Sequence, residues 1–172
     1  MSKRFGSQHH GSGGFKDEWQ SLVKDEFTAN EQAVQIGVVD AAGIVIASTA
    51  MLHPNPPIDI SDREHFRVHE QSQKDALFIS QPVIGRASGK SSIQFTRPFW
   101  GADGKFAGVI VVSLDPSHLS RVYGNLNLGQ DGGVALVGTD GIIRAGTGIY
   151  AGLLGANGVA WPRRNGCGSR RR

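Results

Sequence analysis

The sequence predicts an α+β fold: a five-stranded antiparallel sheet with a long N-terminal helix and a connecting helix over one face. Two observations predict it. Short runs rich in Val, Ile, Phe and Thr alternate apolar with polar residues and fall into a group of two and a group of three. Apolar residues at helical spacing stand before, between and after these groups. Strands joined by tight turns pair antiparallel, so the helix between the two groups must cover a face of their common sheet.

The first elements are a helix and a hairpin. Five apolar residues recur at helical spacing among Lys, Asp, Glu and Gln and predict an amphipathic helix: Phe15, Trp19, Leu22, Val23 and Phe27. Residues 34–40 and 44–48 indicate two short strands, joined by a tight turn at residues 41–43.

The connecting segment is expected to begin as a loop and continue as a helix. Three prolines within residues 53–57 exclude regular structure there. Ser61 and Glu64 have the spacing of a capping box, which predicts a helix from Ser61 to about Lys74. Three further strands are expected at residues 76–84, 92–99 and 105–114, and a last helix after Asp115 and Pro116.

The stretch GRASGKSS (residues 85–92) ends like a phosphate-binding loop, but two features argue against a nucleotide site. The pattern G-x-x-x-x-G-K-[ST] requires glycine at position 84, where Ile84 stands. A strand pattern follows Lys90, whereas the amides and lysine of such a loop converge on phosphate only when a helix begins there. We therefore expect a hairpin turn in which Gly85 and Gly89 supply backbone freedom, and no bound cofactor.

Positive charge is concentrated at the two ends of the chain. Lys3, Arg4 and five arginines after position 162 lie in Gly/Ser-rich ends that contain no acid. Without those seven, residues 15–161 hold 11 basic and 15 acidic residues, a formal charge of −4, which argues against nucleic acid as a partner. No apolar run approaches the ~20 residues of a membrane span, so the chain is expected to be soluble. Its single cysteine, Cys167, excludes an internal disulfide.

Four regions are expected along the chain. Residues 1–14 form a flexible N-terminus and residues 15–128 form one complete module. Residues 129–150 begin a second module, because residues 137–143 repeat the hairpin pattern of residues 39–45. No strand pair or long amphipathic helix completes that second module, and the Gly/Arg-rich residues 151–172 are expected to be a disordered tail.

Four stretches in this order resemble the Cache sensor domains, which are extracytoplasmic PAS-like modules of bacterial receptors. They are residues 59–67 (DISDREHFR), 78–86 (FISQPVIGR), 88–94 (SGKSSIQ) and 103–115 (DGKFAGVIVVSLD). The resemblance covers about residues 34–144 and implies a PAS-like fold of the double-Cache type, with only the first module complete.

The resemblance also implies a role in signal transduction. Such a module binds a small molecule on the periplasmic or extracellular side of the inner membrane and has no catalytic activity. Segments outside this chain would connect it to the membrane and to a diguanylate cyclase, histidine kinase or chemotaxis output domain. The N-terminal helix would be available for a homodimer.

The resemblance further implies ligand-binding residues at the start of the connecting helix. Amino-acid-binding members carry an Arg-x-Trp-Tyr run there; Arg63 matches the Arg, while His65 and Phe66 stand at the Trp and Tyr positions. The Asp expected near the end of the last strand aligns with Ser113, which cannot neutralise an ammonium group. We therefore expect a small carboxylate or another anion as the ligand.

Further candidate ligand contacts lie on the neighbouring strands, and each candidate has a structural alternative. We add Phe78, Ser80, Phe95 and Arg97 to the set. The aromatic residues, Phe66 included, would otherwise be plain core, and Arg97 would point to solvent. Arg63 would otherwise form a salt bridge with Asp62 or Glu70.

Two alternative functions stay open at the level of sequence. One is a structural or interaction domain of the same fold with an occluded pocket. The other is a metal-dependent enzyme, because His65 and His69 stand four residues apart on the expected helix. Glu64 precedes the first histidine, so no glutamate occupies the general-base position of H-E-x-x-H, and we expect neither a metal ion nor catalysis.

Overall fold

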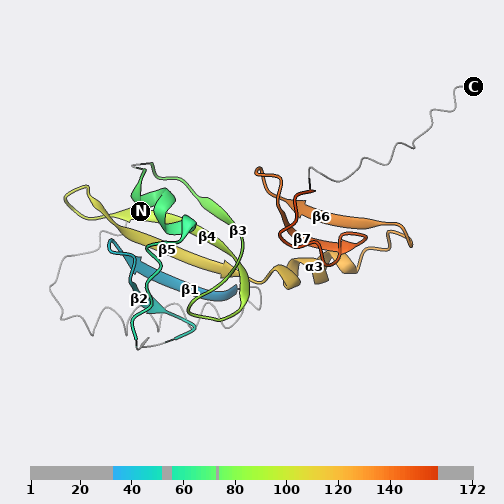
Figure 1. Cartoon of the computed structure of the whole chain (residues 1–172), viewed down its shortest axis with the longest axis horizontal. Helices are drawn as coiled ribbons and strands as arrows, with labels where there is room; N and C mark the ends of the chain where they lie inside the picture. Colours follow the sequence, from blue (N-terminus) through green and yellow to red (C-terminus); the bar gives the residue numbers. More distant parts are fainter. Residues whose placement is uncertain (1–32, 52–55, 73, 159–172) are drawn as a thin grey trace, which may run out of the picture. The chain divides into compact units, whose positions relative to one another are not determined.

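The computed structural model describes residues 33–51, 56–72 and 74–158, which fall into two compact units divided between Pro116 and Ser117. In the first unit five strands form one antiparallel sheet in the order β2-β1-β5-β4-β3 (Figure 1). The strands are β1 (Ala33–Asp40), β2 (Val45–Ser48), β3 (Phe78–Ile84), β4 (Ser91–Trp100) and β5 (Phe106–Leu114). The predicted α+β fold with a five-stranded antiparallel sheet is therefore confirmed. The long helix expected from residue 15 lies outside the described residues.

The last strand of the unit, β5, lies at the centre of the sheet. It pairs with β1 on one side and with β4 on the other, so it joins the two hairpins that the sequence predicted separately. Val109 is the partner of both Val39 and Pro98 in this pairing, and side chains opposite each other in a ladder share one face. These three residues thus form an apolar row across the sheet, on the face that carries the core.

The connecting helix α2 (Glu64–Glu70) contacts β3, β4 and β5 on this same face. Phe66 is its fully buried anchor, and its ring meets Phe106 edge to face with the centroids 5.8 Å apart. Such a pair adds about 0.5–1.5 kcal/mol to the burial of the two rings. The core of the unit consists of Val39, Val45, Ile60, Phe66, Val109 and Val111.

The helix is shorter than predicted, and the expected capping box is wrong. Arg63 occupies the N-cap position, and no side chain caps the helix. The Ser61 amide donates instead to the Asp59 carboxylate at 2.8 Å, and the Arg63 amide donates to the Ile60 carbonyl. A side-chain turn at Asp59 therefore holds Ser61 in a loop before the helix and moves the first helical residue to Glu64.

The stretch GRASGKSS is the predicted hairpin turn between β3 and β4. The Gly85 amide donates to the Lys90 carbonyl at 2.9 Å, and the Gly89 amide donates to the Gly85 carbonyl at 2.8 Å. Gly89 has a φ of 65°, in the region that favours glycine, whereas Gly85 is not among the glycines with positive φ. Because a strand and not a helix follows Lys90, the arrangement lacks the helix N-terminus of a phosphate-binding loop.

The second unit follows from β5 through helix α3 (Pro116–Gly124). It contains one antiparallel hairpin of β6 (Gly133–Val137) and β7 (Ile143–Gly148). Arg144 is buried in this unit and forms a paired contact with the Asp140 carboxylate. The assignment of this hairpin to an incomplete second module stays a prediction.

The turn between β1 and β2 contacts the loop that leads into α2, and this contact can be tested. Gly43 has a φ of 84°, and a Cβ placed there would lie 2.6 Å from the Ser61 Cβ. Gly43→Ala is therefore expected to combine backbone strain with a steric clash and to lower the free energy of unfolding by about 2–4 kcal/mol. Urea denaturation of the two proteins measures the loss.

Gly104→Ala is the matched control for this substitution. Gly104 has a φ of 75°, but a Cβ there would meet nothing within 4 Å. Only the backbone cost of about 1–2 kcal/mol is therefore expected. Equal losses for the two variants would contradict the close approach of Gly43 to Ser61.

Candidate functional site

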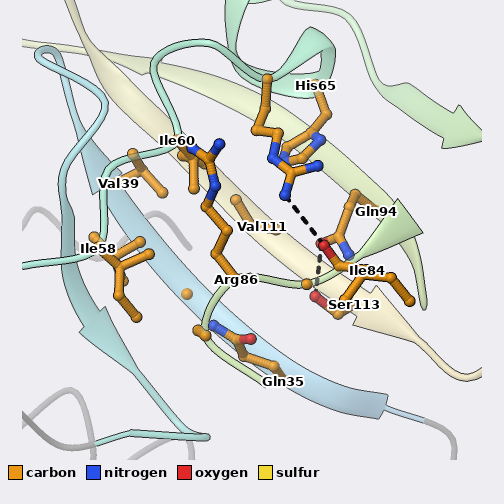
Figure 2. A pocket seen from close by; sticks show the side chains of 15 residues that line it. Gln35, Val39, Ile58, Ile60, His65, Ile84, Arg86, Gln94, Val111 and Ser113 are labelled. Atoms are coloured by element: carbon orange, nitrogen blue, oxygen red, sulfur yellow. Dashed lines mark hydrogen bonds between the residues drawn. The ribbon is translucent and has the colours of Figure 1, made fainter. Parts of the chain in front are cut away.

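A small pocket lies between the inner face of the sheet, the segment before α2 and the turn after β3 (Figure 2). Its volume is about 40 Å³, whereas a single water molecule needs about 10–15 Å³ by the same measure. The pocket thus has room for about three water molecules. The residues that line it are Gln35, Gly37, Val39, Val45, Ile58, Ile60, Arg63, His65, Ile84, Gly85, Arg86, Ala87, Gln94, Val111 and Ser113.

The floor of the pocket is a row of three neutral polar side chains across the sheet. Ser113 on β5 is the register partner of Gln35 on β1 and of Gln94 on β4. All three are buried, although Gln and Ser are usually exposed residue types. Aliphatic side chains of the core, among them Val39 and Val111, continue the same face (Figure 2).

Hydrogen bonds fix the orientation of the floor. The Ser113 hydroxyl donates to the Gln94 Oε1 at 2.6 Å, and the Gln94 Nε2 donates to the Ser92 Oγ at 2.8 Å. On the other side of the row, the Gln35 Nε2 donates to the Ser48 Oγ at 2.9 Å. Buried polar groups with partners of this kind are rigid and carry a fixed pattern of donors and acceptors.

Arg63 brings a positive charge to the pocket from the N-cap of α2. Its guanidinium donates one hydrogen bond, from Nη2 to the Ile84 carbonyl at 3.3 Å, which is long for such a bond. Across residues 33–51, 56–72 and 74–158, no carboxylate forms a salt bridge with it. The salt bridge with Asp62 or Glu70, considered as the alternative role for this residue, is therefore not formed within these ranges.

Arg86 is a second guanidinium at the pocket, and it is paired. Its Nη1 and Nη2 donate to the two carboxylate oxygens of Asp62 at 2.5 and 2.7 Å, and Nη1 also donates to the Asp59 carbonyl. The Arg86 side chain extends from the turn after β3 toward Ile60 (Figure 2). The hydrogen bonds from Arg86 hold the pKa of Asp62 below its usual value, so the pair is charged at neutral pH. This salt bridge connects the turn after β3 to the segment before α2.

His65 is the third basic side chain of the lining, and it is neutral at physiological pH. Only 7% of the residue is exposed. Burial, together with the nearby charge of Arg63, lowers the pKa of its imidazole from 6.5 to about 4. Among the residues that the structure describes, the lining therefore contains two guanidinium groups, a neutral imidazole and no Asp or Glu.

The sequence-predicted site residues divide into two groups. Arg63, His65 and Ser113 line the pocket, whereas Phe66, Phe78, Ser80, Phe95 and Arg97 do not. Phe66 belongs to the core, and Phe78 meets the His69 ring edge to face at 6.4 Å. Ser80 is buried, and its hydroxyl accepts from the backbone N–H of Gln94. Phe95 is paired with Val112, on the opposite face of the sheet from Gln94 and Ser113.

Arg97 also lies on that opposite face. It forms a bidentate pair with Asp75, and 62% of its side chain is exposed. This placement matches the alternative considered for it, a side chain directed to solvent.

Sequence reasoning missed Gln35, Gln94 and Arg86. In both strands the glutamine stands in the less apolar half of the alternation, which is typical of a solvent-facing position, so no signal in the sequence indicated its burial. Arg86 lies in the stretch that the sequence predicts to be a hairpin turn, and nothing in the sequence indicates that this turn folds back over the sheet.

The two histidines of α2 have different surroundings. His69 is buried and its Nε2 lies 2.9 Å from the Thr96 Oγ1, while His65 faces the pocket. Within the part of the chain that the structure describes, no three His, Cys, Asp or Glu side chains are grouped as a metal site would require.

Comparison with known proteins identifies the family. A family model described as a Cache domain matches residues 5–162, so the chain belongs to the Cache domain family. Cache domains are noncatalytic ligand-binding sensor modules, in agreement with the predicted family and the predicted absence of catalysis. A search of curated protein sequences finds no significant match.

Solved structures support the same fold. The extracellular domain of the putative histidine kinase rpHK1S-Z16 is 28% identical with a TM-score of 0.69, over 86% of this chain and 58% of that one. An extracellular ligand-binding receptor from Desulfohalobium retbaense is 19% identical with a TM-score of 0.60, over 82% and 25%. The ligand-binding domain of the Pseudomonas fluorescens chemoreceptor CtaA, in complex with L-leucine, is 21% identical with a TM-score of 0.59, over 80% and 55%.

The chain therefore spans less than two thirds of the length of each of these three proteins. Among the helices that the structure describes, none is long and apolar enough to cross a membrane.

The buried imidazole of His65 predicts a pH dependence of stability. Between pH 6.5 and about 4 the unfolded chain binds a proton at this residue and the native chain does not, so stability falls as the pH falls. The full effect is about 3 kcal/mol. His65→Gln removes this contribution, and its free energy of unfolding is expected to fall less between pH 7 and pH 4 than that of the original protein.

Urea unfolding at pH 7, 6, 5 and 4 measures both curves. The pKa of His69 is also lowered by burial, so His69 contributes a slope of the same sign that both proteins keep. Parallel curves for the two proteins would show that the His65 imidazole is accessible to protons in the native state.

Proposed function

We propose that this chain is the ligand-sensing part of a membrane receptor, exposed outside the cytoplasm, and that its ligand is a small carboxylate. Support for the sensor role comes from the Cache family and from likeness to the extracellular domains of a putative histidine kinase and of a ligand-binding receptor. Support for the ligand class comes from the pocket itself.

The observation that carries the ligand class is the charge of the lining. Arg63 offers a guanidinium fork whose one hydrogen bond is long, and no acid lines the pocket. A guanidinium pairs bidentately with a carboxylate, and such charge-assisted bonds are about twice as strong as neutral ones. A ligand ammonium group would instead lie beside Arg63, with Arg86 already paired to Asp62 and no acid in the lining, which is unfavourable for a desolvated cation.

This preference separates the chain from relatives that bind amino acids. The Pseudomonas fluorescens chemoreceptor CtaA was solved with L-leucine, and a Campylobacter jejuni chemoreceptor, Tlp3, with 4-methylisoleucine. Those likenesses of 21% and 15% identity concern the fold alone. The small cavity with aliphatic walls suits a carboxylate with a short aliphatic chain.

The position of the pocket suggests how binding produces a signal. Arg63 is the N-cap of α2, Arg86 lies on the turn after β3, and Ser113 stands three residues before the first residue of α3. A carboxylate held between the helix start and the floor would favour the conformation in which these elements are closest. The ligand thereby shifts the population of receptor states by its differential affinity for them.

Arg63→Ala tests the proposed carboxylate site. Binding of propionate to the full chain is measured by isothermal titration calorimetry, with propionamide as the uncharged ligand of the same shape. The substitution is expected to weaken propionate binding roughly tenfold to a hundredfold, which corresponds to the ~1.5–3 kcal/mol of a charge-assisted hydrogen bond. Propionamide is expected to bind more weakly than propionate and to respond little to the substitution.

Arg67→Ala is the matched control, because it removes the same charge one turn further along α2 from an exposed residue outside the pocket lining. Circular dichroism confirms that both variants are folded. Equal propionate affinity of the original protein and Arg63→Ala would remove Arg63 from the site. Failure of every carboxylate to bind would favour the alternative, an interaction domain of the same fold without a ligand.

A further inference from the structure

The hydrogen-bond pattern of the pocket floor carries information about the ligand beyond its carboxylate. A hydroxyl group has a single hydrogen, and that of Ser113 is donated to the Gln94 Oε1. The Gln94 amide is thereby engaged at both ends, since its Nε2 donates to Ser92. What Ser113 presents to the pocket is therefore an oxygen that can only accept.

Gln35 offers a second acceptor beside it in the same row. Its Nε2 donates to the Ser48 Oγ, a hydroxyl that also accepts from the Ala50 amide at 3.1 Å, so the Gln35 amide is held through its nitrogen end. Its Oε1 is the acceptor at the other end of this amide, on a side chain that is 7% exposed and lines the pocket. Across residues 33–51, 56–72 and 74–158, no group donates to this oxygen or to the Ser113 Oγ.

The two ends of the pocket therefore require different groups from a ligand. The end near Arg63 supplies donors with positive charge, and the floor supplies neutral acceptors. An acceptor covered by a ligand without a donor stays unsatisfied, which weakens binding. An ammonium group could donate to the floor, but it would bring a second positive charge beside Arg63 into a lining with no acid, where Arg86 already occupies Asp62. A hydroxyl group donates without adding charge.

We infer that the pocket is specific for a short hydroxycarboxylate, whose carboxylate binds Arg63 and whose hydroxyl group donates its one hydrogen to the Gln35 Oε1 or to the Ser113 Oγ. This inference rests on the proposed carboxylate site and adds Gln35 and Ser113 as the residues that determine specificity. It distinguishes three acids of nearly the same shape, which carry hydrogen, hydroxyl or ammonium at one carbon: propionate, L-lactate and L-alanine.

Calorimetric titration of the full chain with these three acids, and with 3-hydroxypropionate, tests the inference. At least one of the two hydroxy acids is expected to bind roughly three- to tenfold more tightly than propionate, which is the range for one neutral hydrogen bond. L-Alanine is expected to bind more weakly than the better hydroxy acid. If neither hydroxy acid exceeds propionate, or if L-alanine exceeds both, the inference is wrong.

Two substitutions at Gln35 locate the effect. Gln35→Met keeps the length of the side chain and removes the acceptor, so it is expected to abolish the preference for the hydroxy acid over propionate. Gln35→Glu adds a negative charge at the same place and is expected to raise the affinity for L-alanine relative to the hydroxy acid. Unchanged preferences in both variants would remove Gln35 from the ligand site.

Failure of this inference and failure of the proposed function give different results. If propionate binds and Arg63→Ala weakens it, but hydroxy acids gain nothing, the carboxylate site stands and the assignment of the floor is wrong. If none of the four acids binds, the proposed function itself fails. The comparison of ligands on the unsubstituted protein needs no variant. It therefore decides the inference even if the Gln35 variants do not fold.

Discussion

The pairing register of β5 with its two neighbours is the constraint on which the pocket depends. It places Gln35, Ser113 and Gln94 in one row and Val39, Val109 and Pro98 in another, both on the face that α2 covers. Side chains alternate between faces, so a slip of one residue would move every one of them to the opposite face. The apolar row packs against the helix and thereby fixes the register. The same register holds the polar row in the interior, where buried amide groups depend on hydrogen-bond partners.

The second requirement is that the segment before α2 stays close to the sheet. The Val45 amide donates to the Ile58 carbonyl, and the Ile60 amide donates to the Gly43 carbonyl, so this segment runs beside the β1–β2 turn. Arg86 adds a bidentate salt bridge with Asp62, whose side chain is 61% exposed. Exposed pairs contribute only about 0–1 kcal/mol, so the turn after β3 is held more weakly than the strands. A ligand bridging the helix start and the sheet can therefore change the population of closed states with a modest binding energy.

Much of the fold followed from local sequence patterns. The alternation of residues 92–99 and 105–114 indicated β4 and β5 within a residue or two, because a half-buried strand needs that period. The start of α2 did not follow, because Asp59 competes for the Ser61 amide and a capping box pattern carries no information about that competitor. The composition of the pocket followed only in part. Arg63 and Ser113 came from a resemblance, whereas Gln35 and Gln94 enter the same row only because β1 and β4 pair with β5 from opposite sides.

The local charge of the pocket also differs from the charge of the chain around it. Residues 15–161 carry a formal charge of −4, yet the lining contains no acid. At physiological ionic strength charges are screened beyond about 8 Å, so a bound anion responds to Arg63 and Arg86 far more than to distant surface carboxylates. Asp62 offsets Arg86 at the rim, and the burial of His65 keeps its imidazole uncharged. At the proposed carboxylate site, Arg63 is therefore the charge that a ligand would meet, and the neutral floor acceptors rather than further charges would distinguish one small carboxylate from another.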